Sequence, residues 1–416
     1  MEKKEKAPVL RFKDTNGKDY PAWEQRKLTD LVSFYGGLTY KPTDVKSKGV
    51  LVLRSSNVKD GALIDADNVY VDPDVATSEK VKVGDIVMVV RNGSKALIGK
   101  HAEVKQPMAD TVVGAFMAGI RSPCPSFANA LLNTSEFDKE IAKNMGATIN
   151  QLTGYMFKQM VFFMPGKEEQ EKIGSLFSTL ENIITLHQRK LEALKKLKRT
   201  LLQKMFPKKG HLKPELRFFG FTNDWEQRKL NEIASIYDGT HQTPRYTSNG
   251  IPFLSVENIT TLQSSKFISE KDFLRDFPVY PKKGDVLLTR IGDVGTANVY
   301  ERNQKVAFYV SLALLKLRET DPYFVNASFR SNSTRKEVWK RTLHIAFPKK
   351  INKNEIGKVN IQIPSLAEQR KIGIFFYSLD RLITLHQRNS PYQKQLRVEI
   401  NCRNFSKLNT LGNSVS

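Results

Sequence analysis

Two long stretches of the chain carry apolar residues at helical spacing, and each follows a region of shorter, strand-like patterns. The first stretch begins after Pro165 and stops at Pro207, and the second begins after Pro364. In both, apolar residues recur about every 3.6 positions, which is typical of a helix that buries one face. About 38 residues in the first, at ~1.5 Å each, predict a rod roughly 55–60 Å long.

The two helices are expected to bury these faces on each other as an antiparallel coiled coil, because they are too long to be covered by a small domain. The residues predicted to form the seam are Ile173, Phe177, Leu180, Ile184, His187, Leu191, Leu194 and Leu201 in the first helix, and Ile372, Phe376, Leu379, Ile383 and His386 in the second.

The regions before the helices predict small domains of mixed α and β structure. Each opens with WEQRKL followed by apolar residues at helical spacing, which indicates a short helix. Strand patterns bounded by Gly, Pro, Asn and Asp come next, among them VLVLRSSNV and IPFLSVENI. These patterns predict small antiparallel or mixed sheets.

Sequence matches at a nearly constant offset relate the two halves, so we interpret the chain as a tandem duplication. Most residues between the matches differ, which indicates one scaffold with two different surfaces. The matches are WEQRKL at 23–28 and 225–230, the Gly-Asp strands around Gly84 and Gly284, EQEKIG at 169–174 with EQRKIG at 368–373, and TLHQR at 185–189 and 384–388. The resulting fold class is α+β, divided into a domain at 1–165, a helix at 166–207, a second domain at 208–363, a second helix at 364–390 and a tail at 391–416.

The tail departs from the duplication. Pro391 follows the second TLHQR by three residues, and proline removes a helical hydrogen bond and clashes with the preceding turn. A break or kink is therefore predicted at Pro391, with a tail that does not continue the helix.

Charge separates this chain from an ordinary globular protein. It has 66 Lys and Arg residues against 43 Asp and Glu residues, a net charge of +23. Such an excess favours a polyanionic partner, of which nucleic acid is the leading case, over a chain that is merely basic. Two cysteines, no long apolar span and no apolar segment at the N-terminus favour a soluble cytoplasmic protein without a disulfide framework.

Segments of the sequence that resemble catalytic or metal-binding motifs each lack part of the motif. GSKALIGKH at 93–101 has the wrong glycine spacing for a phosphate-binding loop, so a strand–turn–strand is expected. IGDVGT at 291–296 predicts a turn, and DPYF at 321–324 predicts a turn followed by a helix. The six histidines lack the spacing of a zinc site. No catalytic residue and no metal ligand is assigned.

Polar and basic residues in the loops are the candidates for contact with DNA. Arg suits guanine, Asn and Gln suit adenine, and Lys or Arg at loop edges suits phosphates. The candidates are Thr39, Lys41, Arg54, Ser55, Asn57, Arg91, Asn92, Ser94 and Lys95 in the first half, and Thr240, His241, Gln242, Thr243, Arg245, Tyr246 and Arg290 in the second.

Taken together, the duplicated domains opened by WEQRKL, the Gly-Asp strands, the long helices and the loop DGTHQTPRY resemble the specificity subunit of type I restriction–modification systems. The resemblance spans nearly the whole chain. It implies a non-enzymatic protein whose two target-recognition domains each read one half of a split double-stranded DNA site, while the paired helices hold the domains apart.

The resemblance also implies partners that supply the chemistry. Two modification subunits would carry S-adenosylmethionine and methylate adenine N6, and restriction subunits would use ATP and Mg²⁺. No cofactor is expected on this chain. Two alternatives remain open from the residues alone: a DNA-acting methyltransferase or nuclease with degenerate motifs, and a coiled-coil assembly protein.

Overall fold

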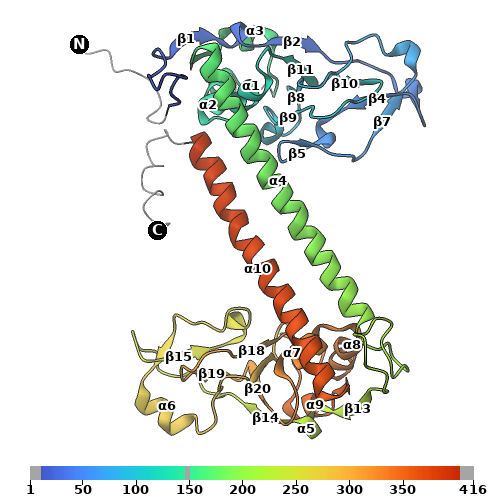
Figure 1. The fold of residues 1–416 in the computed structure, drawn as a ribbon, viewed down its shortest axis with the longest axis vertical. Coiled ribbons are helices and arrows are strands. Elements are labelled where there is room, and N and C mark those ends of the chain that lie inside the picture. Colours follow the sequence, from blue (N-terminus) through green and yellow to red (C-terminus); the bar gives the residue numbers. More distant parts are fainter. Residues whose placement is uncertain (1–10, 146–149, 403–416) are drawn as a thin grey trace. The chain divides into compact units, whose positions relative to one another are not determined.

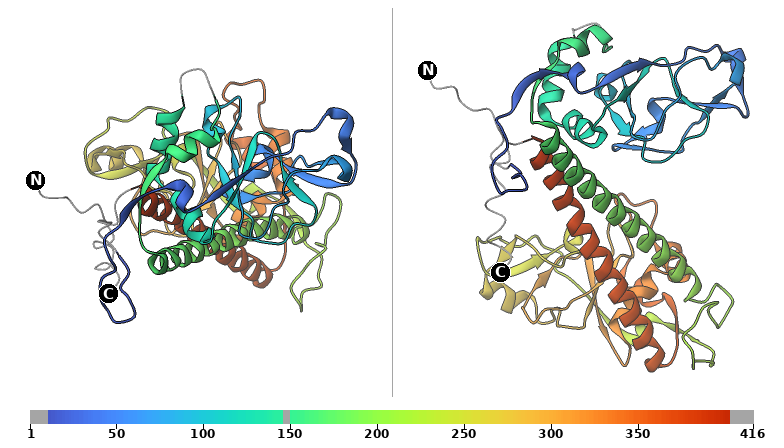
Figure 2. Two further views of the ribbon diagram at one scale, coloured as in Figure 1. Left: turned by 90° about the horizontal axis from the view of Figure 1, so that it is seen from above. Right: turned by 45° about the horizontal axis from the view of Figure 1, so that its top comes forward.

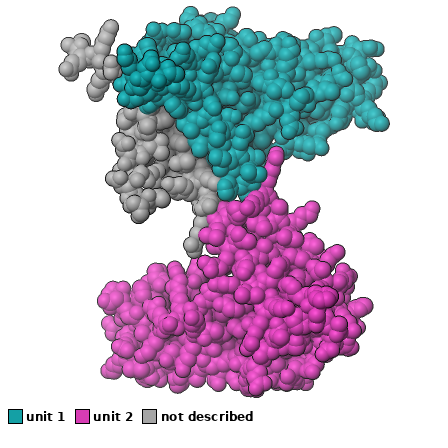
Figure 3. Space-filling model, viewed as in Figure 1, with its two compact units in different colours: residues 1–187, 389–416 teal, residues 188–388 magenta. Residues whose placement is uncertain are grey.

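The computed structural model describes residues 11–145 and 150–402 of the chain. They form two compact units, one built mainly from residues 1–187 and the other from residues 188–388 (Figure 3). The division falls inside both long helices. The domain boundaries inferred from the sequence therefore stay predictions.

The first unit contains two four-stranded sheets and two strand pairs, with helices at one side (Figure 1). One sheet is antiparallel, in the order β2 (Ser33–Gly36), β11 (Met117–Arg121), β8 (Ile86–Val89) and β9 (His101–Glu103). The other is mixed, in the order β10 (Thr111–Val113), β4 (Val50–Leu53), β7 (Val69–Val71) and β3 (Val45–Lys46). The strand pairs are β1 (Glu24–Lys27) with β12 (Val161–Met164), and β5 (Val58–Lys59) with β6 (Ala62–Leu63); the helices are α1 (Pro125–Leu132), α2 (Ser135–Asn144), α3 (Gly154–Gln159) and α4 (Lys167–Lys204).

The second unit repeats this plan. Its antiparallel sheet has the order β14 (Ala234–Asp238), β20 (Leu312–Leu317), β17 (Val286–Thr289) and β18 (Ala297–Val299). Its mixed sheet has the order β16 (Phe267–Ile268), β15 (Ile251–Leu254) and β19 (Ala307–Phe308), and β13 (Glu226–Lys229) pairs with β21 (Asn360–Ile363). The helices are α5 (Leu230–Ile233), α6 (Glu270–Asp276), α7 (Pro322–Arg330), α8 (Asn332–Arg341), α9 (Lys353–Gly357) and α10 (Leu366–Cys402).

The duplication and the α+β class are thus confirmed, whereas the prediction of a helix that opens with WEQRKL is wrong in both halves. Its residues EQRK form an exposed strand, β1 or β13, which pairs with the strand that precedes the long helix. Only a single turn follows, at Leu28–Asp30 in the first unit and Leu230–Ile233 in the second. Pairing with a distant strand overrides the local helical spacing, which is carried by that one turn.

The repeated Gly-Asp pairs close the turn before each central strand. The glycine has a positive φ, 90° in one unit and 91° in the other. Asp85 Oδ2 accepts the Lys82 backbone N–H at 2.9 Å, and both of its carboxylate oxygens accept from the Arg121 guanidinium at 2.7 and 2.8 Å. Although burial opposes ionisation, the hydrogen bonds from Arg121 and Tyr35 lower the pKa of Asp85. Asp285 makes the same turn and accepts from Lys316 at 2.6 Å.

A buried glutamate in the first turn of each long helix holds the segment that precedes the domain. Glu169 and Glu368 are fully buried. Arg11 donates to both oxygens of Glu169 at 3.2 and 2.7 Å, and Arg217 donates to both oxygens of Glu368 at 2.7 and 2.7 Å. Trp23 adds an indole N–H bond to Glu169 at 3.2 Å. We name these two ion pairs the Arg–Glu clamps.

Next to each clamp, a glycine lets the long helix lie against the backbone of a domain helix. A Cβ added at Gly174 would lie 2.7 Å from the Phe127 nitrogen of α1, and one at Gly373 would lie 2.8 Å from the Phe324 nitrogen of α7. Real Cβ contacts are not this short, so a side chain would push helix and domain apart. The repeated sequence KIG therefore marks the site where each domain is fixed to its helix.

Helices α4 and α10 use their apolar faces for two purposes. Ile173 and Phe177 pack into the core of the first unit, and Ile372 and Phe376 into the core of the second. Further along, within the second unit, Leu191 of α4 packs against Leu379 and Ile383 of α10, with Leu194 and Leu201 beside them.

The paired helical segments run antiparallel in the second unit, because later residues of α4 meet earlier residues of α10. Lys198 forms an ion pair with Asp380, and Phe206 contacts Phe376 with ring centroids 6.0 Å apart. Figures 1 and 2 show these segments side by side. Burial and the nearby Arg330 guanidinium lower the pKa of Lys198. Predicted seam residues therefore pack on one another in this portion, whereas those nearest the start of each helix pack into a domain core.

Of the break or kink predicted at Pro391, the structure excludes the break. Helix α10 runs from Leu366 to Cys402 and continues past this proline, whereas the remaining residues of the predicted tail lie outside the described part of the chain. A proline inside a helix removes one hydrogen bond and costs about 3 kcal/mol, which a long helix with a packed N-terminal half can tolerate.

The clamp predicts the effect of Arg217→Ala on stability. This substitution leaves the Glu368 carboxylate buried without its partner, so we expect it to lower the free energy of unfolding of the second unit by about 3–5 kcal/mol. Urea unfolding of the full chain, followed by circular dichroism, measures the change. Arg228→Ala is the control, because its pair with Glu232 is exposed and contributes about 0–1 kcal/mol. Equal unfolding midpoints for the two variants would contradict the role of the clamp.

Candidate nucleic-acid interface

The candidates of the first unit lie on three loops that follow β2, β4 and β8, and the fold brings these loops together. Leu38, just after β2, donates its N–H to Val113 of β10 at 2.7 Å, and Gly114 donates to Leu53 of β4 at 2.9 Å. The side chain of Asn92 donates to Ser55 Oγ at 3.3 Å, which joins the loops after β4 and β8. The three loops that carry the candidates of this unit therefore form one surface.

Within this surface, some candidates shape the loops. Asn57 is 1% exposed, and its side-chain N–H groups bond the Ala66 carbonyl at 2.8 Å and Asn68 Oδ1 at 2.9 Å. Its Oδ1 accepts the Arg54 backbone N–H at 2.9 Å. Asn57 has no group left to read a base, so we correct its assignment to a residue that positions the loop. The Arg54 side chain is held by Asp67 at 2.6 Å.

Other candidates of the first unit are open to solvent, namely Thr39, Lys41, Arg91, Ser94 and Lys95. The Arg91 guanidinium lies over the ring of Phe116, 5.3 Å from its centroid. Phe116 is 56% exposed and belongs with this surface. The sequence does not reveal it, because it lies in TVVGAFMAGI, a run in which most other apolar residues belong to buried strands.

The second unit presents the loop that follows β14. Its base is fixed, because Thr240 donates to the Phe308 carbonyl at 3.2 Å and accepts from the Val310 N–H at 2.9 Å. Beyond Thr240, the side chains of His241, Gln242, Thr243 and Arg245 are exposed. Tyr246 turns back and packs edge-on against Phe253, with ring centroids 5.8 Å apart.

Arg290 belongs to the support of this loop and not to its exposed face. It is 8% exposed, forms an ion pair with Asp238 at the start of the loop, and donates to the Ile351 carbonyl at 3.2 Å. The prediction that Arg290 contacts DNA is therefore corrected: a buried guanidinium with two internal partners positions the loop. Sequence alone does not separate it from an exposed arginine at a strand end.

The two loops occupy the same place on the duplicated scaffold. The chain passes the neighbouring strand closely at Gly37 and Gly239, where an added Cβ would lie 2.9 Å from the Val113 oxygen and 2.6 Å from the Tyr309 oxygen. Each glycine is followed by a parallel bridge, from Leu38 in one unit and Thr240 in the other. Most side chains that follow differ between the units: KPTD at 41–44 corresponds to TPRY at 243–246, and only the proline is shared.

The motifs set aside in the sequence are turns in the structure, as predicted. Residues 95–97 form a single 3-10 turn between β8 and β9, and IGDVGT contains two glycines with positive φ. Asp321 caps α7 by accepting the Phe324 N–H at 2.8 Å.

His187 and His386 are half-buried on the long helices. Over residues 11–145 and 150–402, no three His, Cys, Asp or Glu side chains gather as metal ligands would, and no helix has the length and apolarity to cross a membrane.

Comparison with known proteins decides the family. The sequence model of the type I restriction modification DNA specificity domain matches residues 21–196 and again residues 222–392. The chain belongs to this family. The match supports DNA sequence specificity as the role of the chain and not catalysis by the chain itself, so the recognition interpretation is favoured over the enzyme alternative.

Individual relatives agree with the family match. The chain is 23% identical over 277 residues to the type I restriction enzyme MjaVIII specificity subunit of Methanocaldococcus jannaschii, covering 62% of this chain but only 64% of that protein, less than two thirds. It is 22% identical over 394 residues to the EcoKI specificity subunit of Escherichia coli K12, covering 86% of this chain and 82% of that protein. A crystal structure of the type I restriction–modification S subunit from M. genitalium superposes with a TM-score of 0.63 at 14% identity, over 94% of this chain and 97% of that one, which shows a shared fold.

Proposed function

We propose that the chain recognises a bipartite, asymmetric DNA target, with one half-site read by each unit. The observation that carries this proposal is the pair of loops after Gly37 and Gly239, which have the same backbone anchor and unlike exposed side chains. A duplicated scaffold presents two readers in equivalent settings. Because the exposed side chains of the two loops differ, the two half-sites should differ in base sequence.

The exposed residues have the chemistry that base reading requires. Arg245 can donate two hydrogen bonds to the O6 and N7 acceptors of guanine, and Gln242 can pair with adenine. Lys41 and Lys95 at the loop edges suit phosphate contacts, which position the protein without reading sequence. The net charge of +23 supports this assignment, because release of counterions from DNA drives such binding.

We further propose that the long helices recruit two copies of one modification subunit. Ile183 and Leu186 of α4 are 44% and 67% exposed, and Leu382 and Leu385 of α10 are 45% and 55% exposed. The pairs are related by the 199-residue offset of the duplication. Repeated exposed apolar pairs suit two identical partners, since each partner can use the same contact.

In this proposal the partners supply the chemistry. The modification subunits bring S-adenosylmethionine for transfer of a methyl group to adenine N6, and the restriction subunits bring ATP and Mg²⁺. This chain selects the DNA site on which the partners act.

Arg245→Ala tests the assignment of the second reader. Losing a bidentate contact to guanine costs about 1–3 kcal/mol of discrimination, so the second half-site should relax at one position while the first stays unchanged. Methylome sequencing of cells that express the chain with its modification subunit reads both half-sites. Arg275→Ala, an exposed arginine of α6 paired with Asp272 and Asp276, is the matched control. An unaltered motif in the Arg245→Ala strain would refute the assignment.

The repeated apolar pairs predict a stepwise loss of partners. Leu382→Ser with Leu385→Ser should reduce the complex from two modification subunits to one, and adding Ile183→Ser with Leu186→Ser should remove the second. Native mass spectrometry of the purified complex counts the subunits. The control is Ile374→Ser, because Ile374 is 64% exposed on the same helix but its equivalent in α4 is the polar Ser175. If all variants keep two modification subunits, the apolar pairs are not the docking sites.

The length of the helices should set the spacer between the half-sites. Seven residues inserted after His187 and seven after His386 add two turns, about 10 Å, and keep the apolar faces aligned. The spacer of the methylated motif should then grow by about 3 base pairs at 3.4 Å each. An insertion in one helix alone serves as the control, since it breaks the match between the two and should abolish methylation. A spacer that stays the same after the double insertion would show that helix length does not set the spacer.

A further inference from the structure

A hairpin of the second unit exposes two large apolar side chains at its tip. The hairpin joins α8 to α9 and spans residues 343–350, and Leu343 and Lys350 pair through backbone hydrogen bonds at 2.7 and 3.5 Å. Ile345 is 99% exposed and Phe347 is 103% exposed, so neither contributes to the core of the unit. Scattered apolar residues on a surface are ordinary, but two fully exposed ones at one tip need a reason.

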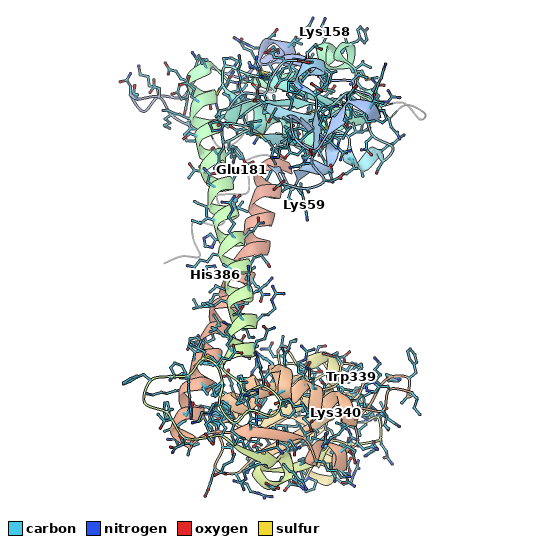
Figure 4. The ribbon with its side chains drawn as sticks, turned by 90° about the vertical axis from the view of Figure 1, so that its right-hand side faces the viewer. Lys59, Lys158, Glu181, Trp339, Lys340 and His386 are labelled. Carbon is cyan, nitrogen blue, oxygen red and sulfur yellow. The ribbon has the colours of Figure 1, made fainter. Side chains whose placement is uncertain are left out.

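The base of the hairpin is held firmly while the tip is free of contacts with the core. Gly292 donates its N–H to the Lys349 carbonyl at 2.8 Å. The His344 ring contacts the Trp339 ring at an angle of 48° with centroids 4.0 Å apart, and its Nε2 is 2.9 Å from the Trp339 carbonyl oxygen. Figure 4 shows Trp339 and Lys340 in α8, which leads into the hairpin, at the surface of the second unit. A rigid base lets the tip enter a partner without a large loss of conformational entropy.

Charge around the tip identifies the class of partner. Residues 335–353 contain seven basic residues and one acidic residue, Glu337. Lys349 and Lys350 flank the tip directly and are exposed, and Lys349 lies over the Trp339 ring at 4.9 Å. An apolar tip within a basic ring fits a nucleic acid, which offers phosphates outside and an apolar base stack inside. An apolar protein groove would not explain the lysines.

The hairpin also adjoins the proposed reader of the second half-site. Ile291 forms a bridge with Lys350, and the neighbouring Arg290 joins the Ile351 carbonyl to Asp238, where the reader loop begins. The tip and the loop containing Arg245 thus share one support.

We propose that Ile345 and Phe347 insert between base pairs of the second half-site and unstack one base step, an inference that rests on the proposed DNA-reading function. Apolar side chains used in this way kink the duplex and make binding depend on how easily the step deforms. The hairpin would therefore add specificity at a step where no hydrogen bond reads a base.

The first unit gives an internal comparison. Leu152 bonds the Val90 carbonyl as Ile351 bonds the Arg290 carbonyl, so these two positions are equivalent in the duplication. Residues 146–149, which precede Leu152, lie outside the described part of the chain. The proposal is therefore made for the second half-site.

The test uses the complex of the full chain with its modification subunits, and duplexes that carry the motif found by methylome sequencing. 2-Aminopurine is placed at successive adenines outside the methylated base, and its fluorescence rises where a base is unstacked. The wild-type complex should give this signal at one step of the second half-site. Ile345→Ser with Phe347→Ser should abolish it and weaken binding of the target duplex about 10- to 100-fold, whereas Phe347→Leu should retain most of both.

Phe219→Ser is the matched control, because Phe219 is 102% exposed in the same unit but lies in another segment. Its fluorescence signal and affinity should equal those of the wild type. An unchanged signal and affinity in the double variant would overturn the proposal, and so would loss of a modification subunit from that variant, which would show that the hairpin binds protein. If the wild-type complex does not distinguish the motif from unrelated DNA, the DNA-reading function itself fails, which is a different result.

Discussion

The structure depends on a buried carboxylate in the first turn of each long helix. Moving a carboxylate out of water costs several kcal/mol, so the fold tolerates Glu169 and Glu368 only with well-oriented donors. Arg11 and Arg217 supply two hydrogen bonds each from segments that precede the domains in sequence. The clamp thereby closes each domain on itself, because it ties the segment that enters the domain to the helix that leaves it.

This closure explains which residues the duplication repeats. The clamp glutamates, the glycines that contact α1 and α7, and the Gly-Asp turns recur because each one fixes backbone to backbone or satisfies a buried charge. None of them belongs to the loops after Gly37 and Gly239. Residues such as Thr39 and Arg245 only point outward from the fixed frame, so they can differ between the units without a cost to folding.

How much the sequence predicts follows the range of the interactions involved. Helical periodicity and the internal repeat predict the two helices, the duplication and the central strands, because these patterns involve neighbouring residues or occur in both halves of the chain. The strand formed by WEQRKL is missed since its partner lies more than a hundred residues away. Asn57 and Arg290 look like DNA-contacting residues, because the burial of a polar side chain cannot be read from residue type. Phe116 and Phe347 are missed for the opposite reason: an apolar residue in an apolar run is expected in a core.

The separation between clamp and loops has an evolutionary consequence. A mutation at a clamp glutamate would leave a largely buried arginine without its partner, and a second change would have to compensate before the domain folds well. A mutation in the loop after Gly239 alters only solvent-facing groups on a backbone that is already anchored. Substitutions should therefore accumulate quickly in the loops and slowly in the frame, so that new target sequences can arise by single steps without passing through unfolded intermediates.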